Sequence, residues 1–390
     1  MLDFENTKIA FQNKSNGDLR WNRFLFKSLA RPSLVKFGKS LTNVALTIGM
    51  PVGWIVKPTL YKHFVGGETI EKCQSVIKDL ARYNVKSILD YSVEGTDKEE
   101  AIESALQETL RSIRNAANDD NIPFAVFKPT AFGESIMLQK ASVNSPLTLH
   151  DEQEKEKFFN RIDVLCKTAY ENNISILIDA EDYAYQAYID EVVEMMMQKY
   201  NKERAIVFNT LQMYRVDRLE FLKESISKAR SEGYYYGVKF VRGAYLEKER
   251  ERARKMEYKD PIQPDKESTD ADYNAALKYS VENIDIVSVF NGTHNEYSSR
   301  YLTELMEEHK IPRDDKRVWF SQLYGMSDHI SFNLAAEGYN VAKYLPYGPV
   351  RHVLPYLIRR AEENTSVKGQ TSRELMLITQ EKKRRKEEKN

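Results

Sequence analysis

Two adjacent arginines near the end of the chain are the most distinctive chemical feature of the sequence. Tyr356, Arg359, Arg360 and Glu363 recur at helical spacing, which would place all four on one helix face. Two neighbouring guanidiniums can clamp a planar anion, most simply a carboxylate. The alternative is a surface helix whose arginines pair with Glu362 or Glu363.

The residues that precede the arginines favour the binding role. Residues 339–345 alternate apolar and polar side chains as in a short strand, and the following turn puts Pro349 at the first position of a helix. A helix entered directly from a strand begins beside the strand's carboxyl end. Because ligands of α/β proteins collect at that edge, we expect the arginines to face a ligand.

Polar residues also close other strand-like runs of the sequence. Lys128 or Asp179 could be half of a buried ion pair inside a barrel. Six strand ends that carry polar residues favour one shared site instead. Arg242 precedes Gly243, which lacks a side chain and so permits close backbone approach to a flavin or a phosphate.

Two kinds of site are not supported by the motifs. His294 could bind a metal, but no second His or Cys lies at helix or strand spacing from it, so we expect no metal site. The glycine motifs of Rossmann and P-loop nucleotide sites do not occur.

Short apolar runs that could position these residues alternate with long polar or amphipathic stretches from Val85 onward. Eight such units predict an α/β fold of the (β/α)8 barrel type. The predicted strands are 87–91, 124–129, 174–180, 205–212, 237–242, 285–291, 318–324 and 340–345.

The barrel should be flanked by two helical segments. We expect an N-terminal helical arm at 1–82, the barrel at 83–365 and a charged C-terminal helix at 366–390. Within the barrel, 97–118 and a segment opening at Asp151 should be helices, and 256–272, with two prolines, should be a long loop. The basic run 382–386 is either a solvated helix end or a surface for an anionic membrane or partner.

Composition narrows the classes of partner and compartment. The chain has 58 basic and 58 acidic residues, so no overall field favours nucleic acid. Its two cysteines cannot form a disulfide framework or a zinc site, which indicates a reducing compartment. No secretory signal or Arg-rich transit peptide is evident. We expect an intracellular protein, in the bacterial cytoplasm with possible inner-membrane association, or in mitochondria if eukaryotic.

One uncharged stretch, 40–56, resembles a membrane segment but is close to the lower length limit for a span. Polar residues, glycines and a proline interrupt it. A packed or surface-adsorbed element is therefore expected, and the basic residues upstream of it would suit peripheral membrane contact.

Two motifs carry a family resemblance. Residues 238–249, VKFVRGAYLEKE, and residues 344–364, from YLPYGP to YLIRRAEEN, look like proline dehydrogenase, with weaker similarity from Tyr61 to the end. The form resembled is the stand-alone, mitochondrial-like enzyme rather than the fused bifunctional one. The resemblance implies a distorted barrel that binds FAD non-covalently and oxidises L-proline to Δ1-pyrroline-5-carboxylate by hydride transfer. Electrons would pass to a membrane quinone; no oligomeric state is implied.

The resemblance also implies roles for substrate-binding residues. Arg359, Arg360 and Lys128 would bind the substrate carboxylate, and Glu363 would support them. Asp179 and Tyr245 would form a polar network beside the substrate, and Glu94 would pair with Arg359 as a gate over it. The substrate ring would pack against Ala244, Leu323 and Tyr344. Because the Tyr344 phenol would leave little room for a 4-hydroxyl, proline is expected over hydroxyproline.

For the flavin, the resemblance implies contacts from the ends of the fourth, fifth and sixth strands. Leu246, Lys239 and Asp265 stand where some members carry Trp, Arg and Arg, so the adenine and pyrophosphate contacts are the least defined. The implied flavin contacts are Gln212, Lys239, Val241, Arg242, Gly243, Thr293 and His294.

Three other functions compete with this one. A Schiff-base aldolase would use Lys239 as the amine nucleophile, with Asp179 or Tyr245 as its acid/base partner. A non-catalytic module could use the arginines to sense an amino acid. Methylenetetrahydrofolate reductase is another flavin barrel, but the Arg-Arg-x-x-Glu helix is not expected there.

Overall fold

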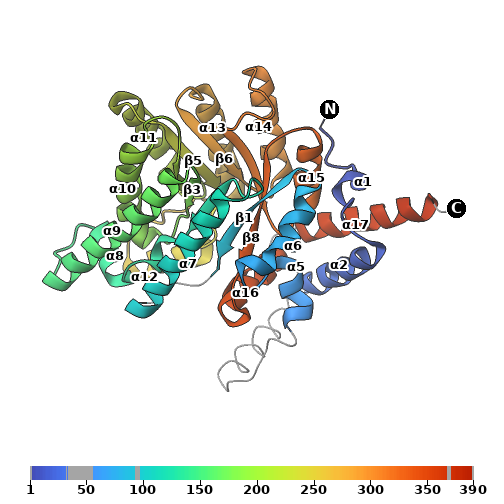
Figure 1. Ribbon diagram of the computed structural model, residues 1–390, viewed down its shortest axis with the longest axis horizontal. Helices are drawn as coiled ribbons and strands as arrows, with labels where there is room; N and C mark the ends of the chain where they lie inside the picture. The colour runs from blue at the N-terminus through green and yellow to red at the C-terminus, as the bar shows by residue number, and fades with distance from the viewer. Residues whose placement is uncertain (1, 32, 34–55, 93–96, 367–369, 389–390) are drawn as a thin grey trace.

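The central element is a barrel of parallel strands (Figure 1). The computed structural model describes residues 2–31, 33, 56–92, 97–366 and 370–388, except for the side chains of 362–366 and 370. Eight strands pair in the order β1-β8-β7-β6-β5-β4-β3-β2, and β1 approaches β2 to bring the barrel close to closure. The predicted (β/α)8 fold is confirmed. The strands are β1 Val85–Tyr91, β2 Phe124–Phe127, β3 Ser175–Ile178, β4 Val207–Gln212, β5 Tyr236–Val241, β6 Val287–Gly292, β7 Val318–Leu323 and β8 Val341–Tyr347.

Helices surround the barrel, with α6 leading into β1 and the others following the strands. Local signals explain several of their starts, as at α9, where Thr148 and Asp151 form a capping box. The barrel helices are α6 Ile70–Ala81, α7 Glu99–Ala117, α8 Ser135–Ser142, α9 Leu149–Glu171, α10 Tyr183–Tyr200, α11 Arg218–Glu232, α12 Leu246–Met256, α13 Lys266–Glu282, α14 Glu296–Glu308, α15 Asp328–Ala336 and α16 Val350–Ser366.

The segment 256–272 was expected to be a loop, but its last residues, 266–272, belong to helix α13. Helix α13 already begins at Lys266 because the side chain of Asp265 accepts a hydrogen bond from the Ser268 N–H, 2.7 Å away, and so caps the helix. The loop prediction was wrong for 266–272, since the two prolines affect only the residues before this cap.

The strand-to-helix turn before the arginines differs slightly from the expectation. Strand β8 continues through Pro346 to Tyr347, and α16 begins at Val350. Pro349 therefore precedes the helix, and its carbonyl accepts the Val353 N–H at 3.1 Å. Gly348, with φ of +143°, makes the turn possible.

Aromatic rings fill the barrel interior below the strand ends. The ring of Phe124 meets those of Phe208, Phe290 and Trp319 edge-on, at centroid distances of 5.6, 5.2 and 5.3 Å. Tyr344 packs on Phe290 at 6.2 Å. Above this plug, inward side chains at the carboxyl ends of the strands are placed where barrel proteins bind ligands.

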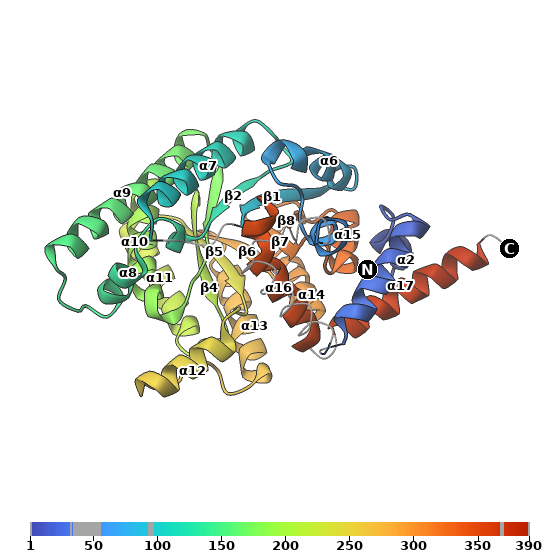
Figure 2. The same cartoon turned by 90° about the horizontal axis from the view of Figure 1, so that it is seen from below.

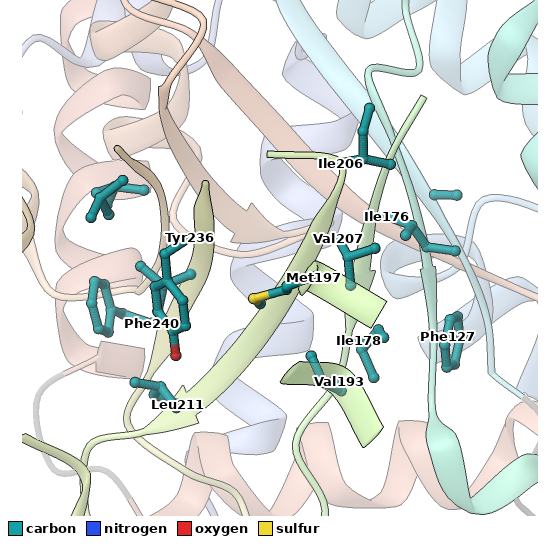
Figure 3. Packing of buried hydrophobic residues seen from close by; sticks show 14 of the residues in the cluster. Phe127, Ile176, Ile178, Val193, Met197, Ile206, Val207, Leu211, Tyr236 and Phe240 are labelled. Carbon is teal, nitrogen blue, oxygen red and sulfur yellow. The ribbon is translucent and has the colours of Figure 1, made fainter. Parts of the chain in front are cut away.

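Outward-facing residues of the strands pack against the helices (Figure 3). Ile176 and Ile178 of β3 are buried in one cluster with Val193 and Met197 of α10. Burial of each such side chain contributes roughly 1.5–3 kcal/mol. The strand ends are thereby held on a rigid scaffold.

The N- and C-terminal segments pack together outside the barrel, where α2 and α17 lie side by side (Figure 2). Leu377 and Ile378 of α17 are buried with Leu19 and Phe26 of α2. These elements are α1 Thr7–Ala10, α2 Asn16–Leu29, the π-helical η1 Lys57–Tyr61, α5 Lys62–Phe64 and α17 Gln370–Glu387.

The basic run of α17 is partly engaged rather than simply solvated. Arg385 donates to the carbonyl oxygens of Phe11 and Lys14 at 2.9 and 2.8 Å, and with Arg384 it pairs with the buried Glu381. Apart from Val56, the uncharged stretch 40–56 lies outside the described residues. Within the described part of the chain, no helix is both long and apolar enough to cross a bilayer.

Candidate active site

A cluster of opposite charges occupies the mouth of the barrel. Asp179, just after β3, accepts hydrogen bonds from Lys239 of β5 and from Lys128 after β2, the latter at 3.3 Å. Lys128 also lies 3.3 Å from Asp90 of β1. Tyr344 of β8 joins the cluster, with its hydroxyl 2.7 Å from the Lys239 ammonium and 3.3 Å from Asp179. The structure thus brings four of the predicted site residues together, and the ion-pair interpretation of Lys128 and Asp179 is also correct.

Neighbouring charges favour the ionised forms of Asp179 and Lys128 in this cluster, whereas burial opposes the charge of Lys239. Burial alone would raise the pKa of Asp179, but Lys239 and Lys128 outweigh it, so the pKa is lowered. Burial would lower the pKa of Lys128, yet Asp90 and Asp179 raise it overall. Burial dominates at Lys239 and lowers its pKa. The mouth of the barrel therefore presents fixed charges that can orient a zwitterionic ligand.

A second polar group surrounds Glu181, two residues beyond Asp179. Its carboxylate accepts from Thr130 at 2.7 Å and from the Tyr245 hydroxyl at 3.4 Å. Burial raises the pKa of Glu181 to about 7 and that of Tyr245 well above its usual value. Tyr245 is therefore a hydrogen-bond donor beside the charge cluster.

Helix α16 carries the two arginines as predicted. Arg360 is buried and lies 5.3 Å from the centroid of the Tyr356 ring, whereas Arg359 is half-buried. The charge of Arg359 opposes the rise in the pKa of Tyr245. The pKa of His294 is lowered to about 3, mainly by burial and to a smaller extent by the charges of Lys343 and Arg360. Each arginine thus acts electrostatically on a residue that follows β5 or β6, two paired strands of the barrel.

Two predicted site residues cannot be placed. Glu94 lies outside the described residues, and so does the side chain of Glu363. The gate and the supporting role expected of them stay predictions.

Leu323 at the end of β7 connects two apolar clusters. It packs against the barrel cluster that contains Tyr344 and against the outer cluster that contains Tyr356. This position supplies an apolar surface between the strand ends and the arginine helix.

The residues expected to contact a flavin lie along β4, β5 and β6. Arg242 is fixed by Asp270 and Thr293, each 2.7 Å away, and its guanidinium lies over the Tyr273 ring. His294 lies 3.0 Å from the Ser327 hydroxyl. Val241 is half-buried, whereas Gly243 and Ala244 are exposed.

Gly243 is required by its surroundings, for a reason that the sequence did not indicate. Its φ is +133°, and a Cβ there would lie 2.5 Å from the ring of Tyr214. The close approach is therefore to a tyrosine of this chain, and approach to a ligand stays a prediction.

Comparison with known proteins decides the family. The family model described as proline dehydrogenase matches residues 73–373. The chain belongs to the proline dehydrogenase family.

Two proteins are similar to this proline dehydrogenase family member in sequence, and one solved structure is similar to it in fold. Carbapenem antibiotics biosynthesis protein CarD of Pectobacterium carotovorum is 36% identical, over 83% of each chain. Proline dehydrogenase 1, mitochondrial, of Dictyostelium discoideum is 30% identical over 98% of this chain and 75% of its own length. Proline utilization A of Bdellovibrio bacteriovorus has a similar fold (TM-score 0.71, 20% identity); the match covers 93% of this chain and 36% of that one.

The residues at the strand ends fit a flavin of the kind implied by the family resemblance. The Gln212 amide nitrogen donates to the Glu181 carbonyl oxygen at 2.7 Å, while its buried Oε1 has no hydrogen-bond partner among the described residues. A buried acceptor without a partner is costly and suits a ligand donor. Gln212, Lys239 and Thr293 would contact such a cofactor.

Three residues of the site were not assigned from the sequence. Asp90 ends β1 and follows the same strand-end rule that identified Asp179. Glu181 was visible in the same motif as Asp179. Ser327 had no sequence signal, because its contact with His294 joins two separate loops.

Proposed function

We propose that this protein oxidises L-proline to Δ1-pyrroline-5-carboxylate with FAD as cofactor and a quinone as final electron acceptor. Membership of the proline dehydrogenase family supports the substrate and the reaction. The observation that carries the proposal is the ion cluster of Lys128, Asp179, Lys239 and Tyr344 at the barrel mouth.

The arginine helix and Lys128 would bind the substrate carboxylate. Arg359 and Arg360 offer bidentate donors, and Lys128, which follows β2, adds a point charge. Tyr344 and Leu323 would bound the apolar ring. Holding the ring in one orientation and excluding water is the main contribution of the protein to hydride loss.

The chemistry balances as a two-electron oxidation. A hydride leaves a ring carbon next to nitrogen, a proton leaves the nitrogen, and a C=N bond forms. FAD, when bound, supplies the two-electron acceptor. The Asp179 carboxylate and the Lys239 side chain bonded to it would define the polar surroundings of the reacting ring.

Electron transfer to a quinone requires contact with a membrane, and α2 offers a suitable surface. Phe24 is 62% exposed on this helix. Arg20, Arg23 and Lys27 are exposed around it. An exposed aromatic flanked by basic residues suits adsorption to an anionic bilayer. We propose peripheral attachment through α2.

Turnover with an artificial electron acceptor tests the proposed activity. Purified protein supplied with FAD should reduce such an acceptor when L-proline is added, and a trap specific for Δ1-pyrroline-5-carboxylate should detect the product. Proline binding without turnover would indicate a sensor instead. Irreversible trapping of a carbonyl substrate on Lys239 by borohydride would indicate an aldolase.

A further inference from the structure

Three segments from outside the barrel converge on the loop that joins β7 to α15, residues 324–327. Two belong to the N-terminal arm and the third is α17. Their contacts are Lys14 to Asp328 at the start of α15 (3.5 Å), His63 to the Gly325 carbonyl (2.8 Å) and Glu374 to the Ser327 N–H (2.6 Å).

The loop has an unusual backbone that needs such support. Ser327 has a φ of +51°, a left-handed conformation that is uncommon for a residue with a side chain, and it is only 1% exposed. Lys343 of β8 fixes the loop from the barrel side by donating to the Met326 carbonyl oxygen at 2.5 Å. The N–H of Ser327 points to α17, where Glu374 accepts it.

Glu374 is an unusual residue for this position. It is 4% exposed, although it lies on a helix at the outside of the fold. Its oxygen is 4.0 Å from His329 Nδ1, and burial raises the pKa of its carboxyl group. Burying an acid costs stability unless the acid makes specific hydrogen bonds. The bond to Ser327 is therefore the interaction that explains its presence.

The side chain of Ser327 connects this loop to His294 of the proposed cofactor site. Its hydroxyl lies 3.0 Å from His294 Nδ1, and a neutral imidazole has its second nitrogen defined by the bond that the first one makes. We propose that Glu374 is a positioning residue: it holds Ser327, and through Ser327 it orients His294 toward the flavin. This inference rests on the proposed function, because it requires a flavin beside His294.

The affinity of the full-length, flavin-free protein for FAD tests the proposal, measured by quenching of flavin fluorescence. Glu374→Ala should raise the Kd for FAD about tenfold, since it leaves a buried N–H without an acceptor. Glu374→Gln keeps an acceptor oxygen and should restore Kd to within about threefold of the wild type. Ser327→Ala should weaken binding like Glu374→Ala, while leaving the backbone N–H in place.

Arg385→Ala is the matched control, because Arg385 anchors the far end of α17 without touching the loop. It should lower the melting temperature but leave Kd for FAD unchanged. Equal weakening by Arg385→Ala and Glu374→Ala would show that only helix docking matters and would overturn the proposal. So would wild-type affinity in both Glu374→Ala and Ser327→Ala. If the wild type itself binds no FAD, the proposed function fails and the inference falls with it.

Discussion

The Lys239 ammonium lies 2.7 Å from the hydroxyl oxygen of Tyr344, and this hydrogen bond joins β5 to β8 across the barrel interior. The two strands are not neighbours in the sheet. Because the Tyr344 hydroxyl is also 3.3 Å from Asp179, its ring is held in one place by two charged groups. A ring fixed in this way can define the shape of a substrate pocket.

Substrate selectivity should depend on the Tyr344 ring. We expect kcat/KM for L-proline to exceed that for trans-4-hydroxy-L-proline by roughly tenfold or more in the wild type. Tyr344→Ala should narrow this ratio, whereas Tyr344→Phe, which keeps the ring, should preserve it. Steady-state kinetics with both substrates provide the measurement. Equal efficiency of the wild type on the two substrates would disprove the role of Tyr344.

The arginine clamp should act mainly on substrate binding. Arg359→Ala or Arg360→Ala should each weaken proline binding by roughly 2 kcal/mol, about 30-fold in KM, with a smaller effect on kcat. Arg351→Ala is the control, because Arg351 is exposed on the first turn of the same helix. An unchanged KM in both clamp variants would remove these arginines from the site.

Glu181 should make stability depend on pH. Burial raises its pKa to about 7, while an unfolded Glu loses its proton near pH ~4.3. Between these values the folded protein keeps a proton that the unfolded chain has lost. Stability should therefore fall as the pH rises through this window, by at most about 4 kcal/mol.

Urea denaturation at pH 5 and pH 8 can measure this contribution. The free energy of unfolding of Glu181→Gln, relative to that of the wild type, should be higher at pH 8 than at pH 5. The reason is that the glutamine cannot ionise. Glu191→Gln, at an exposed position of α10, should parallel the wild type. Parallel pH profiles for Glu181→Gln and the wild type would contradict the raised pKa.

Membrane attachment should depend on α2. Phe24→Ser should reduce cosedimentation with anionic lipid vesicles, since it removes the exposed aromatic anchor. Met256→Ser, at a 60% exposed position of α12, should have no effect. If both variants bind vesicles like the wild type, attachment does not involve this face of α2.

The barrel and the chemistry of its mouth were largely predictable because both follow local rules. Alternating apolar runs predict the strands, and the strand-end rule predicts Lys128 and Asp179 as site residues, which the structure joins by a hydrogen bond. The start of α13 differs from the expected loop because the cap at Asp265, and not the two prolines before it, determines where the helix begins. Side-chain contacts between segments that are distant in the sequence follow no periodic pattern of residues, so they could not be predicted in this way.

The contact of Ser327 with Glu374 is an example of such a long-range relationship. The two residues are 47 positions apart and lie in different elements. Neither belongs to a recognisable motif, and Ser327 has a backbone conformation that its residue type does not favour. Only the packing of α17 against the barrel brings them together.

The visible absorption spectrum of the purified protein, recorded without oxygen before and after addition of L-proline, tests the central claim most directly. We predict a yellow protein with flavin absorption that L-proline bleaches. A protein that binds FAD but keeps its absorption unchanged in excess L-proline would contradict the proposed reaction.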